Sequence, residues 1–108
     1  MQTTPLAQIK ELEVGVLVVL RQQSDKDLPK EIKQLISTVK RNLTDARLDV
    51  RDAEYAENGD DYRRHMAAAR VCLAKIVADI LVLSQHNIFS PVEVAELTAR
   101  LEIIGQAL

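Results

Sequence analysis

Residues that interrupt helices are scarce in this sequence, which has three glycines and three prolines among its 108 residues. Aromatic side chains are also few, with two Tyr, one Phe and no Trp, so stacking of bases on aromatic rings is excluded as a binding mechanism. The single cysteine excludes an internal disulfide, and we therefore expect a reducing, cytoplasmic environment.

Long apolar runs and a strong excess of charge are missing too. The longest apolar run, residues 14–20, is far shorter than the roughly 20 residues that a bilayer span needs. The Met-Gln-Thr-Thr start has no basic region of the kind that opens a signal peptide, so we expect neither secretion nor a membrane partner. The net charge of −2 argues against a strong general nucleic-acid binder, because such domains usually have a pI above about 9.

What remains is sufficient for one folded domain, which we place at residues 1–108. The hydrophobic content of 47% is enough to bury a modest core. A disordered tail would bury too little apolar surface to fold, and this composition with 28% charged residues does not fit one.

Boundary signals divide the chain into four predicted helices. Threonine and serine hydroxyls can cap a helix, acidic residues favour its positive end, and proline fits its first turn because it has no N–H to lose. The second helix is expected to run to about Glu57, with Gly59 supplying the left-handed residue after its end. The predicted helices begin at Thr4-Pro5, Asp27-Leu28-Pro29, Asp60-Asp61 and Ser90-Pro91-Val92-Glu93, the last being a capping-box pattern.

The second and third helices carry apolar residues in alternating steps of four and three, the pattern of a helix that packs along one partner. Because a turn of only a few residues joins them, we expect an antiparallel helical hairpin. Short connections make the other helices antiparallel neighbours as well, so we predict an all-α, up-down-up-down four-helix bundle with a long central hairpin. The two seams are Ile32, Ile36, Val39, Leu43, Ala46, Val50, Ala53 and Tyr62, Met66, Ala69, Leu73, Ile76, Ile80, Leu83.

The predicted hairpin is longer than the two outer helices. At about 1.5 Å per residue, its helices reach roughly 40–45 Å and the outer helices roughly 27 Å. Both outer helices connect to the same end of the hairpin, so the Asn58-Gly59 end is expected to project beyond the four-helix region. Such a projection is a natural place to meet a partner.

Residues for enzyme chemistry do not form a recognisable set. The Glu-x-x-His motif of di-metal bundles is missing from the sequence, so we expect no metal and no other cofactor. Cys72 lies in an apolar stretch, where a thiol is unreactive. Three carboxylate pairs have the spacing that MazG-type nucleotide pyrophosphohydrolases use to hold Mg²⁺ beside phosphates, although such pairs also arise on any charged helix. The pairs are Asp49-x-x-Asp52, Glu54-x-x-Glu57 and Glu93-x-x-Glu96.

Basic residues gather along the second and third helices. Lys33, Lys40 and Arg47 repeat every seven residues and therefore share one stripe, which is suited to meet phosphates. The candidate nucleic-acid or partner-binding residues are Lys33, Lys40, Arg41, Arg47, Arg63, Arg64 and Arg70.

Ion pairing across the hairpin is the competing interpretation of the same residues. Folding the chain about Gly59 brings acids of one helix near bases of the other, and each exposed pair contributes about 0.2–1 kcal/mol. The expected pairs are Arg63 and Arg64 with Glu54 and Glu57, Arg70 with Asp49, Lys75 with Asp45, and Lys40 with Asp79.

The sequence contains more apolar residues than one four-helix core needs. We expect residues 71–83 to be buried on most sides. The surplus indicates either that the core is wide or that a second apolar face packs against another copy of the chain, and we favour the second interpretation, which predicts a homo-oligomer. The surplus positions are Val14, Val16, Leu17, Val18, Leu35, Leu48, Val71, Val82, Val92 and Ile103.

The order of these features resembles a known family. A leading apolar helix precedes Leu28-Pro29-Lys30, which opens a long helix, and a third helix rich in Ala and Leu leads to Ser90-Pro91-Val92-Glu93. The last helix ends Leu101-Glu102-Ile103-Ile104-Gly105-Gln106-Ala107-Leu108. This arrangement resembles the accessory variability determinant (Avd) proteins of diversity-generating retroelements. It is also similar to the four-helix-bundle proteins encoded in intervening sequences of 23S ribosomal RNA, and the resemblance covers most of the chain from Leu28 on.

The resemblance implies a ring-shaped homopentamer that binds the retroelement's reverse transcriptase and its template RNA, helps to make mutagenized cDNA, and has no catalytic residues of its own. We therefore expect a non-catalytic accessory protein, with the basic residues named above as the first positions to test. Two other interpretations stay open. One is a helical protein–protein interaction adaptor of phage or bacterial origin that uses the charged hairpin end, and the other is a MazG-like pyrophosphohydrolase.

Overall fold

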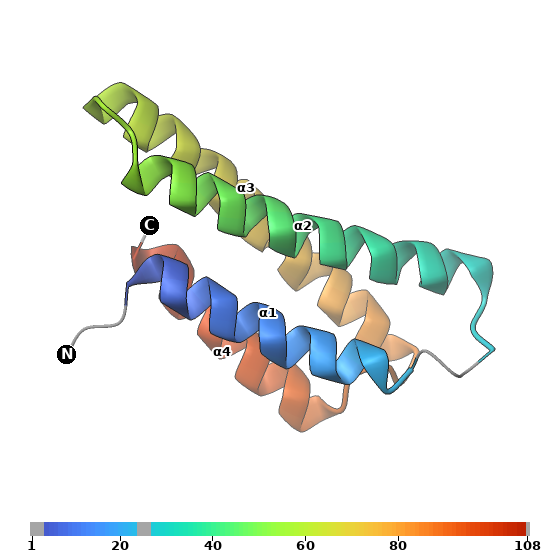
Figure 1. Ribbon diagram of the computed structural model, residues 1–108. Coiled ribbons are helices and arrows are strands. Elements are labelled where there is room, and N and C mark those ends of the chain that lie inside the picture. The colour runs from blue at the N-terminus through green and yellow to red at the C-terminus, as the bar shows by residue number, and fades with distance from the viewer. Residues whose placement is uncertain (1–3, 24–26, 108) are drawn as a thin grey trace.

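The computed structural model describes residues 4–23 and 27–107, and its helices follow the predicted order. α1 spans Pro5–Arg21, α2 spans Lys30–Glu54, α3 spans Gly59–Gln85 and α4 spans Pro91–Ala107. These described ranges contain no strand. Figure 1 shows successive helices running in opposite directions, which confirms the predicted all-α, up-down-up-down bundle.

The four helices close into a ring. Each helix packs against its neighbours in sequence, and α1 also packs against α4. The contact between α2 and α3 is the most extensive, as expected for the long hairpin. In Figure 1 the turn that joins these two helices lies apart from α1 and α4, in keeping with their greater length. Within the described residues, each helix falls short of the length and apolar character that a membrane span requires.

The two heptad seams form most of the core, together with apolar residues of α1 and α4. Tyr62 is an exception: its side chain is 43% exposed, because it lies close to the hairpin turn. Val16, which the sequence suggested as a surplus position, is instead completely buried. Val16 therefore agrees with a core wider than one seam, because α1 packs against both α2 and α4. The expectation that residues 71–83 are buried on most sides is not met within one chain, since Leu81 and Val82 are exposed.

The turn between α2 and α3 differs from the prediction. α2 ends at Glu54 rather than near residue 57, and Gly59 is the first residue of α3 rather than a left-handed residue after α2. Asn58 caps α3 by accepting a hydrogen bond from the Asp61 N–H at 2.8 Å. The Asn-Gly pair therefore starts a helix here, because the asparagine side chain satisfies one of the amides that a helix start leaves unpaired.

The left-handed residue occurs at the end of α3 instead, where Asn87 has a φ of 63°. The Ile88 N–H donates to the Leu83 carbonyl, and the Asn87 N–H donates to the Ser84 carbonyl, each at 3.1 Å. This pair of bonds is a Schellman motif, and Ile88 and Leu83, the two positions whose apolar contact usually accompanies it, are both buried.

Side-chain caps start the two outer helices as predicted. The Thr4 hydroxyl accepts from the Ala7 N–H at 3.2 Å at the start of α1. At α4, the Glu93 N–H donates to the Ser90 hydroxyl at 3.1 Å and the Ser90 N–H donates to the Glu93 carboxylate at 2.8 Å. This reciprocal exchange confirms the capping box.

Candidate nucleic-acid interface

The structure separates the candidate basic residues into two groups. One group lies on the first half of α2 and the other on the first half of α3. Because these helices are antiparallel, the two groups lie toward opposite ends of the hairpin (Figure 1). The groups are Lys33, Lys40 and Arg41 on α2 and Arg63, Arg64 and Arg70 on α3, with Arg47 between them along the chain.

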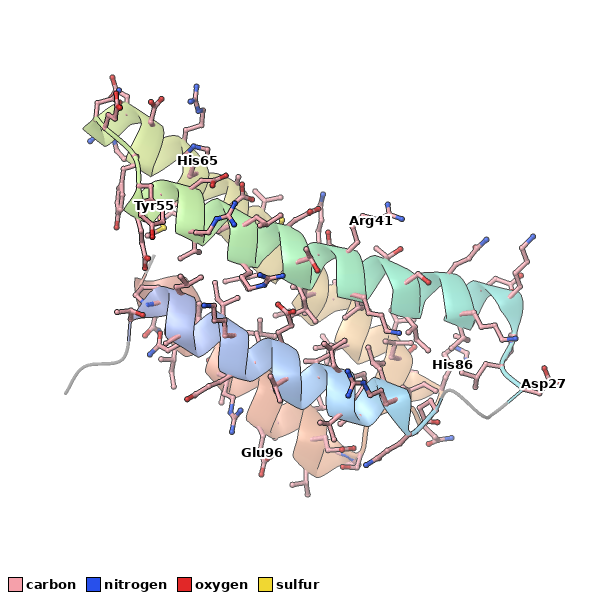
Figure 2. The ribbon with its side chains drawn as sticks, viewed as in Figure 1. Asp27, Arg41, Tyr55, His65, His86 and Glu96 are labelled. Atoms are coloured by element: carbon pink, nitrogen blue, oxygen red, sulfur yellow. The ribbon has the colours of Figure 1, made fainter. Side chains whose placement is uncertain are left out.

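A basic groove follows the outer face of the first half of α2. It has a volume of about 460 Å³, and the described residues that line it include no carboxylate. Lys33 and Arg41 line it together with Lys30, which was not among the candidate residues although it belongs to the same basic stretch. Figure 2 shows the Arg41 side chain pointing away from the bundle. The remaining lining residues are Gln34, Ser37 and Thr38. The Gln34 amide and the Ser37 hydroxyl can donate hydrogen bonds to an anion, whereas the Thr38 hydroxyl donates to the Gln34 carbonyl at 3.0 Å.

The groove begins at the positive end of the α2 dipole. Pro29 occupies the cap position and makes no side-chain capping bond, and Glu31 is the acidic residue of the first turn. Lys30 and Lys33 therefore add positive charge where the helix already presents it, an arrangement that costs about 0.3–1 kcal/mol per charge at low salt. A bound anion would relieve this repulsion, so the sequence of α2 favours phosphate over neutral ligands at this end.

Arg47 makes an ion pair within the chain. Its Nε lies 3.0 Å from Oε2 of Glu13, and the two side chains are 33% and 18% exposed respectively. The pair joins α2 to α1, and the nearby carboxylate balances the arginine charge. We therefore place Arg47 at the edge of the candidate interface rather than at its centre.

Arg63 and Arg64 pair with acids of their own helix. Arg63 contacts Asp60, and Nη2 of Arg64 lies 2.7 Å from Oδ1 of Asp61. The predicted pairing with the acids at the end of α2 was wrong, because acids three residues earlier on α3 are already within reach. The charges of Arg63 and Arg64 are balanced locally, so these two arginines are expected to attract phosphates less than the basic groove does.

Lys40 lies on the same half of α2 as the basic groove and is exposed. Its predicted ion pair with Asp79 does not form in the described part of the chain, and neither does the pair between Lys75 and Asp45. The charge of Lys40 therefore adds to that of the basic groove.

An acidic groove lies between the second half of α2 and the first half of α3, with a volume of about 530 Å³. Burial raises the pKa of the Asp49 carboxyl, while His65 opposes the increase. Burial and the neighbouring carboxylates also raise the pKa of the Cys72 thiol, so this thiol is protonated and unreactive at neutral pH. The groove is lined by Leu48, Ala68, Val71 and Cys72 and by the carboxylates of Asp45, Asp49 and Asp52.

The carboxylate pairs do not assemble a metal site. In residues 4–23 and 27–107, no group of three His, Cys, Asp or Glu side chains is placed to hold a metal ion. Asp49 and Asp52 line the acidic groove, Asp52 lies 3.6 Å from Arg51, and Glu93 caps α4.

Replacing Asp79 with asparagine is expected to stabilise the protein slightly at pH 7, by less than about 1 kcal/mol. Burial raises the pKa of the half-buried Asp79 carboxyl above its ordinary value of 3.8. The folded state therefore binds this proton more readily than the unfolded chain, and stability falls as the pH rises through the window above 3.8. The gain from Asp79→Asn should disappear near pH 3, where both states carry the proton.

Urea unfolding at the two pH values measures this difference, with Glu96→Gln on the exposed surface of α4 as the control. A loss of stability at pH 7, or an equal gain at pH 3, would contradict the expected effect of burial.

No protein-family model, curated protein or solved structure matches this chain.

Proposed function

We propose that this chain is a non-catalytic, homo-oligomeric accessory protein that binds template RNA and a reverse transcriptase in a diversity-generating retroelement. The basic groove on α2 supports the RNA-binding part of the proposal. The reverse transcriptase and the role in mutagenic cDNA synthesis come from the resemblance to Avd proteins. A cytoplasmic location, expected from the single cysteine, fits this role.

The basic groove suits the sugar–phosphate backbone of a nucleic acid rather than its bases. Lys30 and Arg41 are separated by about 16 Å along the helix, with Lys33 between them. A single strand carries one phosphate charge per roughly 3.4 Å of its length, so several phosphates fit along this face. The face has no aromatic residue on which a base can stack, so contacts to phosphate and sugar give binding that is independent of sequence.

Oligomerisation would let such small grooves bind RNA more tightly. One chain offers only three or four cations near the groove, and its net charge is −2. Several copies in one assembly, five if the ring implied by the resemblance is correct, would hold one RNA at several points. Linked sites bind more tightly than single sites because later contacts are intramolecular.

Salt-dependent RNA binding tests the proposal. Single-stranded RNA labelled with fluorescein is expected to bind with an affinity that falls as salt rises, with a logarithmic slope of about −2 to −3 if three or four phosphates are contacted per site. This slope is measured by fluorescence anisotropy at KCl concentrations between about 50 and 200 mM, roughly the range over which such slopes are resolved. If RNA does not bind, or if its affinity does not depend on salt, the RNA-binding part of the proposal is wrong.

The reverse transcriptase is tested separately. We expect a reverse-transcriptase gene beside the gene for this chain, and the two proteins are expected to purify together when they are coexpressed. Copurification that persists after ribonuclease treatment would assign the contact to protein rather than to a shared RNA. An unrelated gene neighbourhood would remove most of the support for the retroelement.

A helical adaptor protein is the second candidate, and the exposed Tyr55 favours it. This side chain is 80% exposed beside the α2–α3 turn, where charged residues also gather (Figure 2). Tyrosine is enriched where proteins meet, and the rim of such an interface is polar. RNA binding that does not depend on salt, together with a protein partner lost on Tyr55→Ala, would favour the adaptor.

A further inference from the structure

The turn between α2 and α3 contains an asparagine that is followed by a glycine. Asn58 and Gly59 are both exposed, whereas the two other asparagines of the chain, Asn42 and Asn87, are followed by leucine and isoleucine. The side-chain amide of an asparagine can be attacked by the backbone nitrogen of the next residue, and glycine crowds this attack least because it has no Cβ. The Asn58-Gly59 pair is therefore the place in this sequence where such a reaction meets the least steric resistance.

The backbone nitrogen of Gly59 is open to this reaction. Gly59 is the first residue of α3, so its N–H is one of the amides that a helix start leaves without a partner in the helix. The fold does not require a glycine here, since its φ is not positive and an added Cβ would first meet the flexible end of the Arg63 side chain, at 3.3 Å. The substitution Gly59→Ala can therefore remove the reactivity of this position without altering the backbone.

Hydrogen bonds hold the Asn58 side chain in place in the folded chain. Its Oδ1 accepts from the Asp61 N–H at 2.8 Å, and its Nδ2 donates to the Asp61 carboxylate at 3.2 Å. Attack by the Gly59 nitrogen closes a five-membered ring, which requires the side chain and the backbone ψ of Asn58, 165° in this structure, to rotate. This rotation breaks both bonds, so the cap must open before the reaction can occur.

The start of α3 can open without unfolding the bundle. The turn lies apart from α1 and α4 (Figure 1), and residues 58–60 are exposed. The first buried residue of α3 is Met66, so loss of the first helical turn uncovers little apolar surface. Local openings of this kind cost less free energy than global unfolding.

We propose that Asn58 is a site of spontaneous deamidation, and that its hydrogen bonds to Asp61 set the rate of the reaction in the folded chain. When the cap opens, the Gly59 nitrogen loses its proton and bonds to Cγ of Asn58, and the side-chain nitrogen leaves as ammonia. Water then opens the resulting succinimide ring at either carbonyl, which gives aspartate or isoaspartate at residue 58. The net change replaces one amide nitrogen with one oxygen from water, and it needs no enzyme, oxidant or reductant.

Either product changes the start of α3. An aspartate at residue 58 replaces the Nδ2 donor with an oxygen and brings a second carboxylate against Asp61. In an isoaspartate the main chain runs through Cγ, so the oxygen that caps α3 becomes a backbone carbonyl and the side-chain cap is lost. Both products make the net charge of −2 more negative by one, in a turn that already contains Glu57 and Asp60. The modification therefore loosens the end of the hairpin that lies apart from the outer helices.

Peptide mass spectrometry of the full chain tests the proposal. The chain is incubated at neutral pH, either folded in buffer or unfolded in guanidinium chloride, and is then cut with trypsin. Cleavage after Arg51 and Arg63 releases a peptide whose one asparagine is Asn58. We expect this peptide to deamidate in both samples, at a rate roughly 5–30-fold lower in the folded chain, which is the factor that one side-chain cap contributes. Asn42 and Asn87 are expected to stay unmodified over the same time.

Two matched variants separate the cap from the general charge of the turn. Asp60→Ala and Asp61→Ala each remove a carboxylate that pairs with an arginine three residues later, but of the two acids Asp61 alone bonds to Asn58. Asp61→Ala is expected to speed up deamidation of the folded chain by about 2–5-fold, the factor that one exposed hydrogen bond contributes, and to leave the rate in the unfolded chain unchanged. Asp60→Ala is expected to leave both rates unchanged, and Gly59→Ala is expected to stop the reaction in both states.

Circular dichroism checks that each variant keeps the helical fold. The proposal is overturned if the folded chain stays unmodified after the unfolded chain has reacted, or if the two states react at the same rate. It is also overturned if Asp60→Ala and Asp61→Ala speed up the reaction of the folded chain equally.

Discussion

Replacing Ile76 with alanine is expected to lower the free energy of unfolding by about 2–5 kcal/mol. Ile76 is completely buried in the seam of α3, so the truncation removes apolar contacts and leaves a cavity that the packed helices fill only partly. The loss is a large share of the roughly 5–15 kcal/mol that stabilises a typical domain. Urea unfolding followed by circular dichroism measures it, and Leu73→Ala, three residues earlier in the same seam, is expected to fall in the same range.

Val92→Ala is the control for this prediction. Val92 is 67% exposed on α4, so its truncation creates no cavity and is expected to change the free energy of unfolding by less than about 0.5 kcal/mol. A loss below about 0.5 kcal/mol for Ile76→Ala would mean that the seam does not form the core.

Removing three charges near the basic groove is expected to weaken RNA binding about 100-fold at low salt. The variant is Lys33→Gln/Lys40→Gln/Arg41→Gln. Each lost phosphate contact is assumed to cost about 1 kcal/mol of binding free energy. Three lost contacts therefore raise the dissociation constant by roughly two orders of magnitude. The same variant should make the logarithmic salt slope shallower by about 2, because three fewer counterions are released on binding.

A matched charge removal at the other end of the hairpin separates local contact from net charge. Arg63→Gln/Arg64→Gln/Arg70→Gln changes the net charge by the same amount, but Arg63 and Arg64 already pair with Asp60 and Asp61. We expect this variant to lose less than about three-fold in affinity, since balanced charges contribute little to binding. Equal losses from both variants would indicate that RNA responds to overall charge, and an unchanged affinity of the α2 variant would remove the basic groove as the binding site.

The architecture was predictable because apolar spacing and capping residues agree along most of the chain. The alternating steps of four and three fixed which faces of α2 and α3 meet, and Ser90 with Glu93 fixed the start of α4. The burial of Val16 could not be decided from sequence because periodicity counts one seam per helix, whereas α1 packs between two neighbours. Gly59 was assigned wrongly because an Asn-Gly pair has the chemistry to end one helix or to start the next.

The candidate site was predictable only in part. Sequence alone indicated the basic stretch on α2, but not that Lys30 shares a groove with Lys33 and Arg41. The ion pair of Arg47 joins residues far apart in sequence, and its partner Glu13 depends on how α1 packs against α2. No rule of spacing within a helix gives such a partner. The acidic groove depends equally on the packing of two helices, which explains why it was found only in three dimensions.

The connection between α3 and α4 opposes domain swapping between copies of this chain. To pass α4 into a neighbouring copy, the chain would have to straighten between Leu83 and Glu93. That change would break the Ile88–Leu83 bond and the exchange of bonds between Ser90 and Glu93, and would expose Ile88 and Phe89 to water. Domain swapping needs a hinge that opens at low cost, and this connection is not one. In the proposed homo-oligomer, subunits are therefore expected to meet as complete bundles, which can separate and reassociate without unfolding.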